Sequence, residues 1–189
     1  MDFREWFYSK LKVGRYPLPQ ELTKAKYGYV INVSDEYIES CHIAAERENT
    51  RYFWFPMNEH SSDIGINSIY GALQIMYVAQ QAGASVMLHC HAGANRSQSV
   101  ADAYYFMHTG KHRKVDEVDE ETRKLNVWLG LSSEYNDNAL EMNCRQKKLP
   151  PLENLEDALR AFKGVFELDE TNRQGWLDKI KSNSLNKVK

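Results

Sequence analysis

Apolar positions in the first half of the chain follow two patterns, and the first predicts strands. Short runs rich in β-branched and aromatic residues are bounded by turn residues, as is typical of strands. The expected strands cover residues 12–14, 27–33, 51–55 and 85–89. We expect the second and third of these to be buried.

The second pattern has the period of a helix. Apolar residues within 66–77 recur at i, i+3, i+4 and i+7, which predicts a helix with one apolar stripe, ended by Gly83. Another helix is expected over about residues 96–108, directly after a tight loop. A short helix carrying Leu22 should precede the second strand.

Strands that alternate with helices indicate an α/β fold. We expect a central, mostly parallel twisted sheet with helices on both faces. In such sheets, ligands usually bind beyond the carboxyl ends of the strands. The loop that follows Leu88 would lie at that edge.

Beyond residue 110 the pattern changes. A densely charged stretch is interpreted as a solvated insertion at about 110–130. After Pro150-Pro151, two amphipathic stretches predict a C-terminal helical extension, residues 150–189, packed on the same domain. Residues 1–149 would form that domain.

Composition adds limits to these expectations. A chain of 189 residues is long enough for one substantial core. Its formal charge of −2 does not favour nucleic acid or an anionic membrane as a partner. The first residues contain no apolar run, and three widely spaced cysteines suit a reducing compartment. We therefore expect a cytoplasmic protein with no membrane span; the oligomeric state stays open.

The loop after the fourth strand carries the chemistry. Small residues between a strand and a helix can turn backbone N–H groups inward, and the helix N-terminus attracts an anion. Gly93 leaves room for that curl. The expected phosphate-binding residues are His91, Ala92, Gly93, Ala94, Asn95 and Arg96.

Four side chains at this loop are candidates for defined roles. Arg96 can grip two phosphate oxygens with its planar fork and stabilise the transition state. The same positive field favours the thiolate of Cys90, the expected nucleophile. Ser97 can donate a hydrogen bond to the sulfur, and His89 can brace the loop from behind.

Together these residues read His-Cys-x-x-Gly-x-x-Arg-Ser, starting at His89. This motif resembles the signature of the protein tyrosine phosphatase superfamily, in particular the dual-specificity phosphatase branch. The resemblance covers about residues 10–110. It implies a dual-specificity phosphatase-like fold and hydrolysis through a phosphocysteine on Cys90, with no metal or cofactor. A metal cluster at His89-Cys90-His91 is disfavoured, because neighbouring residues of a strand point to opposite faces.

The resemblance also implies an upstream aspartate that acts as general acid, about thirty residues before the cysteine. No aspartate stands there. Glu59 has the better position, whereas Asp63 has the expected residue type. Asp63 also precedes the helix at 66–77, where it would cap exposed N–H groups. Both remain candidates, and position favours Glu59.

Several substrates fit the same chemistry. The main expectation is phosphotyrosine in proteins, with phosphoserine and phosphothreonine as further substrates. Asn95-Arg96 also resembles the signature of RNA 5′-phosphatases, and some relatives act on phosphoinositides, although the loop has no lysine for extra phosphates. A phosphate-binding module of low activity is the alternative outside catalysis.

Overall fold

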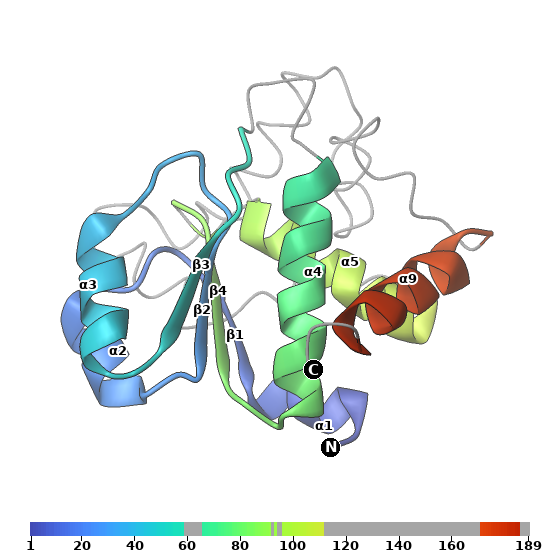
Figure 1. The fold of residues 1–189 in the computed structure, drawn as a ribbon, viewed down its shortest axis with the longest axis horizontal. Coiled ribbons are helices and arrows are strands. Elements are labelled where there is room, and N and C mark those ends of the chain that lie inside the picture. Colours follow the sequence, from blue (N-terminus) through green and yellow to red (C-terminus); the bar gives the residue numbers. More distant parts are fainter. Residues whose placement is uncertain (59–65, 92, 94–95, 112–170, 186–189) are drawn as a thin grey trace.

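Four parallel strands form the centre of the molecule (Figure 1). This computed structural model describes residues 1–58, 66–91, 93, 96–111 and 171–185. The sheet order is β1-β4-β2-β3, so β4 lies between β1 and β2. The strands are β1 (Leu11–Gly14), β2 (Tyr29–Asn32), β3 (Arg51–Trp54) and β4 (Val86–His89). All pairings among them are parallel, where the sequence predicted a mostly parallel sheet.

Helices cover both faces of this sheet (Figure 1). One face carries α2 (Pro19–Ala25) and α3 (Glu39–Arg47). The other carries α1 (Phe3–Ser9), α4 (Ile66–Gln81), α5 (Arg96–Thr109) and α9 (Arg173–Leu185). The predicted α/β class, with a parallel sheet between two helical layers, is confirmed.

Alternating side chains of the central strands build the two halves of the core. Ile31 and Leu88 are fully buried in the larger cluster, beneath α4 and α5. Val30 and Met87 point the other way, into a smaller cluster that contains Cys41. Neighbouring residues of a strand face opposite sides, so strands buried on both faces read as continuous apolar runs.

Two local expectations need correction. The predicted buried strand at 51–55 is instead the edge strand β3, and Trp54 is 40% exposed. Its aromatic residues favoured a buried strand, but β3 pairs only with β2 among the described strands. Helices α1 and α3 were not predicted, because their apolar stripes are short and broken by polar residues.

The C-terminal helix α9 packs against α4 and α5. Ile180 is fully buried in the larger cluster, and the Trp176 ring lies 6.4 Å from that of Tyr70. Arg173 donates to the carbonyl oxygen of Met107 at 3.2 Å. The predicted division into residues 1–149 and 150–189 stays a prediction, because the insertion and most of the extension lie outside the described residues.

His108 gives the fold a testable acid sensitivity. Its ring stacks on Phe3 at 4.2 Å, and its Nε2 is buried without a hydrogen bond. Burial, aided by Lys181, lowers the pKa of His108 from 6.5 to about 4. Between those two values the unfolded chain binds a proton that the folded chain excludes, so stability falls as pH falls.

We therefore expect the variant His108→Phe, which keeps the stacking, to lose less stability on acidification. Between pH 7 and pH 5 its free energy of unfolding should fall by about 1–2 kcal/mol less than that of the parent. Urea unfolding at the two pH values measures this difference. An equal loss in both proteins would contradict the role given to His108.

Candidate active site

The loop from Cys90 to Arg96 joins the carboxyl end of β4 to the start of α5. The peptide group between His89 and Cys90 is held from both sides, by the end of β1 and by the residue after β2. Cys90 N–H donates to the carbonyl oxygen of Gly14 at 3.3 Å, and Val33 N–H donates to that of His89 at 2.8 Å. The central position of β4 thus places the loop at the ligand-binding edge of the sheet.

Two hydrogen bonds reach the sulfur of Cys90. The backbone N–H of Gly93 donates to Sγ at 3.2 Å, and the hydroxyl of Ser97 lies 3.3 Å from it. Cys90 is only 2% exposed, so little water competes for these contacts. Both contacts can stabilise negative charge on sulfur, which is the form that attacks.

The hydroxyl of Ser97 also contacts β1. It has one proton to donate and two possible acceptors, the sulfur of Cys90 and the carbonyl oxygen of Gly14. Its hydroxyl is 3.2 Å from the carbonyl oxygen of Gly14. When Cys90 is a thiol, its S–H can donate to Ser97 while Ser97 donates to Gly14. When Cys90 is a thiolate, the hydroxyl can turn its proton to the sulfur. The same rotation would help the sulfur leave a phosphorylated intermediate.

Among the described residues of the loop, only Gly93 occupies a position that excludes a side chain. Its φ is +75°, and a Cβ added there would lie 2.3 Å from the backbone nitrogen of Arg15. Any side chain would therefore collide with β1 and also strain the backbone. Because this close approach holds the Gly93 N–H against Cys90, the glycine is needed for the geometry of the sulfur.

Arg96 is buried, and its guanidinium is oriented by residues from two other loops. Nη1 donates to a carboxylate oxygen of Asp35 at 2.5 Å and to the carbonyl oxygen of Met57 at 2.9 Å. The sequence analysis missed both partners. A usable signal existed for Asp35, which follows β2 closely at the carboxyl edge, beside β4.

The two histidines beside Cys90 occupy different environments. Nδ1 of the buried His89 lies 3.1 Å from the carbonyl oxygen of Cys90, so this nitrogen carries the proton. Burial lowers the pKa of His89 from 6.5 to about 4, which makes the ring neutral at pH 7. His91 is exposed at the rim, where its Nδ1 lies 3.6 Å from a carboxylate oxygen of Glu36.

Gln98 is a further positioning residue that the sequence analysis did not single out. Its buried amide nitrogen donates to the carbonyl oxygen of Gly93 at 3.1 Å. This bond restrains Gly93 through its carbonyl group, and the N–H of the same residue donates to the sulfur of Cys90. The side chain of Gln98 therefore supports the loop from the first turn of α5.

We expect Gln98→Leu, which keeps the size but loses the donor, to lower kcat by about tenfold. KM should change less, because the charge of Arg96 is retained. Steady-state hydrolysis of an aryl phosphate measures both constants. Gln98→Glu is the matched variant of equal shape. An ionised glutamate cannot donate a hydrogen bond to the carbonyl oxygen of Gly93, so parental activity in this variant would contradict the role given to the amide.

The structure thus brings together Cys90, Gly93 and Ser97, with His89 buried beside Cys90 and His91 at the rim. The guanidinium of Arg96, from the first turn of α5, contacts Asp35 and Met57. The candidate acids Glu59 and Asp63 lie outside the described residues, as do three loop residues, Ala92, Ala94 and Asn95. Among the residues that are described, no cluster of three or more metal-ligating side chains occurs. In the same part of the chain, no helix combines the length and apolarity needed to cross a membrane.

Comparison with known families assigns the class. The family model for the dual specificity phosphatase catalytic domain matches residues 11–127, more than half of the chain. That match includes the strands of the sheet, the Cys90 loop and α5. The chain belongs to the dual-specificity phosphatase family of cysteine-based phosphatases. No curated protein matches the sequence.

Solved structures share the fold at low sequence identity. TpbA of P. aeruginosa is 14% identical, with a TM-score of 0.53 over 91% of this chain and 86% of that one. PTPMT1 is 14% identical, with a TM-score of 0.51 over 94% and 95%. The catalytic domain of the PP-IP phosphatase SIW14 from S. cerevisiae is 13% identical, with a TM-score of 0.50 over 93% and 89%. At such identities the likeness shows the fold alone.

Proposed function

We propose that the protein hydrolyses phosphate monoesters through a phosphocysteine on Cys90, without a metal. The observation that carries this proposal is the pair of hydrogen bonds to the sulfur, from Gly93 N–H and with Ser97. A sulfur that is only buried as a small apolar group would not be expected to have a loop N–H aimed at it.

The chemistry proceeds in two displacements. The thiolate of Cys90 attacks phosphorus and forms an S–P bond, while the P–O bond to the leaving alcohol breaks and an acid protonates that oxygen. Water then attacks phosphorus and gives a proton to the carboxylate of that acid, the S–P bond breaks to regenerate the Cys90 thiolate, and inorganic phosphate leaves. Arg96 and the loop N–H groups stabilise the charge on the equatorial oxygens in both steps. We assign the acid to Glu59, with Asp63 as the alternative.

Phosphotyrosine in proteins is the substrate that we propose, with phosphoserine and phosphothreonine as further ones. Support comes from the family match and from the absence of lysine in the loop sequence, which disfavours substrates with several phosphates. SIW14 is named as a PP-IP phosphatase, so a small phosphorylated molecule is the second candidate. Free Cys41 and Cys90 fit a reducing compartment, and we propose the cytoplasm.

A substrate panel with a chelator present tests this proposal. Phosphotyrosyl, phosphoseryl and phosphothreonyl peptides are compared with a 5′-phosphorylated RNA, a phosphoinositide and an inositol pyrophosphate. We expect kcat/KM to be highest for the phosphotyrosyl peptide. A preference for any of the last three would reject the protein substrate, and no turnover of any compound would favour a phosphate-binding module.

The general acid is tested by two matched variants, Glu59→Gln and Asp63→Asn. On a substrate with a poor leaving group, the true acid's variant should lose about 10²-fold or more in kcat. On an aryl phosphate with a good leaving group the loss should be much smaller. If neither variant shows this dependence on the leaving group, both assignments fail.

A further inference from the structure

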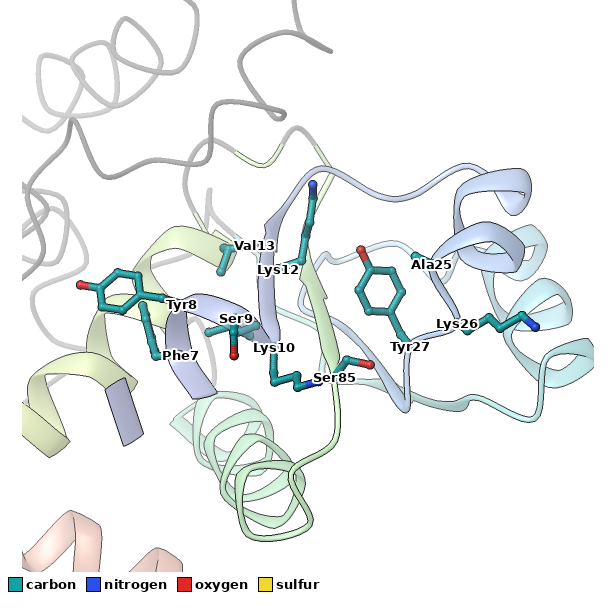
Figure 2. Close-up of a pocket in the computed structure, with 11 residues that line it drawn as sticks. Phe7, Tyr8, Ser9, Lys10, Lys12, Val13, Ala25, Lys26, Tyr27 and Ser85 are labelled. Atoms are coloured by element: carbon teal, nitrogen blue, oxygen red, sulfur yellow. The ribbon is translucent and has the colours of Figure 1, made fainter. Parts of the chain in front are cut away.

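A hollow of about 710 Å³ lies beside the amino ends of two strands, β1 and β4 (Figure 2). Its walls come from the end of α1 and β1, from the turn between α2 and β2, and from the residue before β4. The lining includes the polar and aromatic residues Tyr8, Lys10, Lys12, Lys26, Tyr27 and Ser85.

This hollow is separate from the Cys90 loop. Lys10 and Ser85 precede β1 and β4, whereas Gly14 and Cys90 stand at the far ends of the same strands. Four residues of strand span about 13 Å. The hollow extends along β1 as far as Val13, but a ligand held by Lys10 and Ser85 lies at the opposite edge of the sheet from a phosphate at Cys90.

The hollow is positively charged. Three lysines line it, and none of the described lining residues is acidic, although the whole chain has a formal charge of −2. Within the described ranges, neither Lys10 nor Lys26 forms an ion pair. Figure 2 shows Lys10, just before β1, extending toward Ser85, Lys12 extending from β1 in the opposite direction, and the ring of Tyr27 between β1 and α2. Positive charge therefore stands beside an aromatic surface.

Lys26 occupies a backbone position that a lysine does not favour. It ends α2 in the left-handed region, with φ 51° and ψ 58°, and its N–H donates to the carbonyl oxygen of Leu22 at 3.0 Å. Glycine or asparagine usually fills such a position because a larger side chain strains it. A cation at a helix C-terminus suits the helix dipole, and here it also adds positive charge to the wall of the hollow.

We propose that this hollow binds a small phosphorylated organic molecule with at least two negative charges. Its volume falls within the range of small-molecule sites. Lysines bind phosphate as point charges, and the hydroxyl of Ser85 adds a polar group on the floor. The ring of Tyr27 offers contact area to the organic part.

The proposal is tested by amide chemical shifts of the full ¹⁵N-labelled chain, carrying Cys90→Ser so that no probe is consumed. Pyrophosphate reports the charge alone, and a nucleoside diphosphate adds an aromatic group. Both should shift the amides of Lys26, Tyr27 and Ser85 saturably, with the nucleotide bound more tightly, and high salt should weaken both. Saturable shifts confined to the amides of Cys90 and Gly93 would overturn the second site.

Matched variants localise the binding. Lys10→Gln combined with Lys26→Gly should weaken binding in the hollow by about tenfold or more and leave binding at Cys90 unchanged. The glycine suits the left-handed backbone, so this variant should fold. Lys24 lies in α2 but does not line the hollow. Lys24→Gln also removes one positive charge, and it should leave binding in the hollow unchanged. Equal weakening by both variants, or tighter binding of a hexaglutamate peptide than of either probe, would overturn the proposal.

Discussion

Replacing Cys90 by serine is expected to lower turnover of an aryl phosphate by about 10⁴-fold or more. The substitution exchanges one atom, so the loop and the contacts from Gly93 and Ser97 can persist. A serine hydroxyl does not ionise near neutral pH and no general base stands beside it among the described residues, so the nucleophile is lost while phosphate binding remains. Acid-quenched parent enzyme should contain phosphate bound to Cys90, and the variant should contain none.

Cys41→Ser is the matched control for that experiment. Cys41 is also fully buried, and its thiol donates to the carbonyl oxygen of Pro17 at 3.0 Å. Burial raises the pKa of Cys41 to about 11, so this thiol stays protonated. We expect near-parental activity from this variant. If Cys90→Ser kept a tenth of the parental rate, the nucleophile would have to be another group.

The sequence pattern predicted all four strands, the edge strands β1 and β3 included, but it did not distinguish edge strands from central ones. β2 and β4 are central, so every residue from Tyr29 to Asn32 and from Val86 to His89 is buried, and both runs were recognised. β3 was recognised as a strand but wrongly as a buried one, because an apolar run does not reveal which strand lies at the edge. Helix α3 has a weak stripe and gains its stability from packing on α2 and β3, which no local pattern encodes.

At the site, residues that are close in the sequence could be predicted, whereas residues contributed by other loops could not. Cys90, Gly93 and Ser97 are close in the sequence, and the strand, loop and helix that hold them could be predicted from spacing alone. Asp35 and Met57 come from loops after other strands, and only the sheet order brings them to Arg96. Long-range partners of this kind depend on topology, which the sequence of one chain leaves open.

Arg96→Lys is expected to lower kcat/KM by about 10²- to 10³-fold although the positive charge is kept. A lysine presents one point charge and cannot form two parallel bonds to the phosphate. It also cannot reproduce the bonds from the guanidinium to Asp35 and Met57, so the ammonium would be poorly placed. Steady-state kinetics and vanadate inhibition should both report the loss. Parental vanadate affinity would show that Arg96 does not hold the phosphate.

The ion pair predicts a smaller, separable effect for Asp35→Asn. The asparagine can still accept from Arg96, but it no longer matches the charge, so the guanidinium should sample other orientations. We expect kcat/KM to fall by about tenfold. Glu36→Gln removes the neighbouring carboxylate, which contacts only His91 among the ion pairs described, and should change little. Equal losses in Asp35→Asn and Glu36→Gln would mean that activity depends on the total negative charge of the loop after β2 and not on the orientation of Arg96.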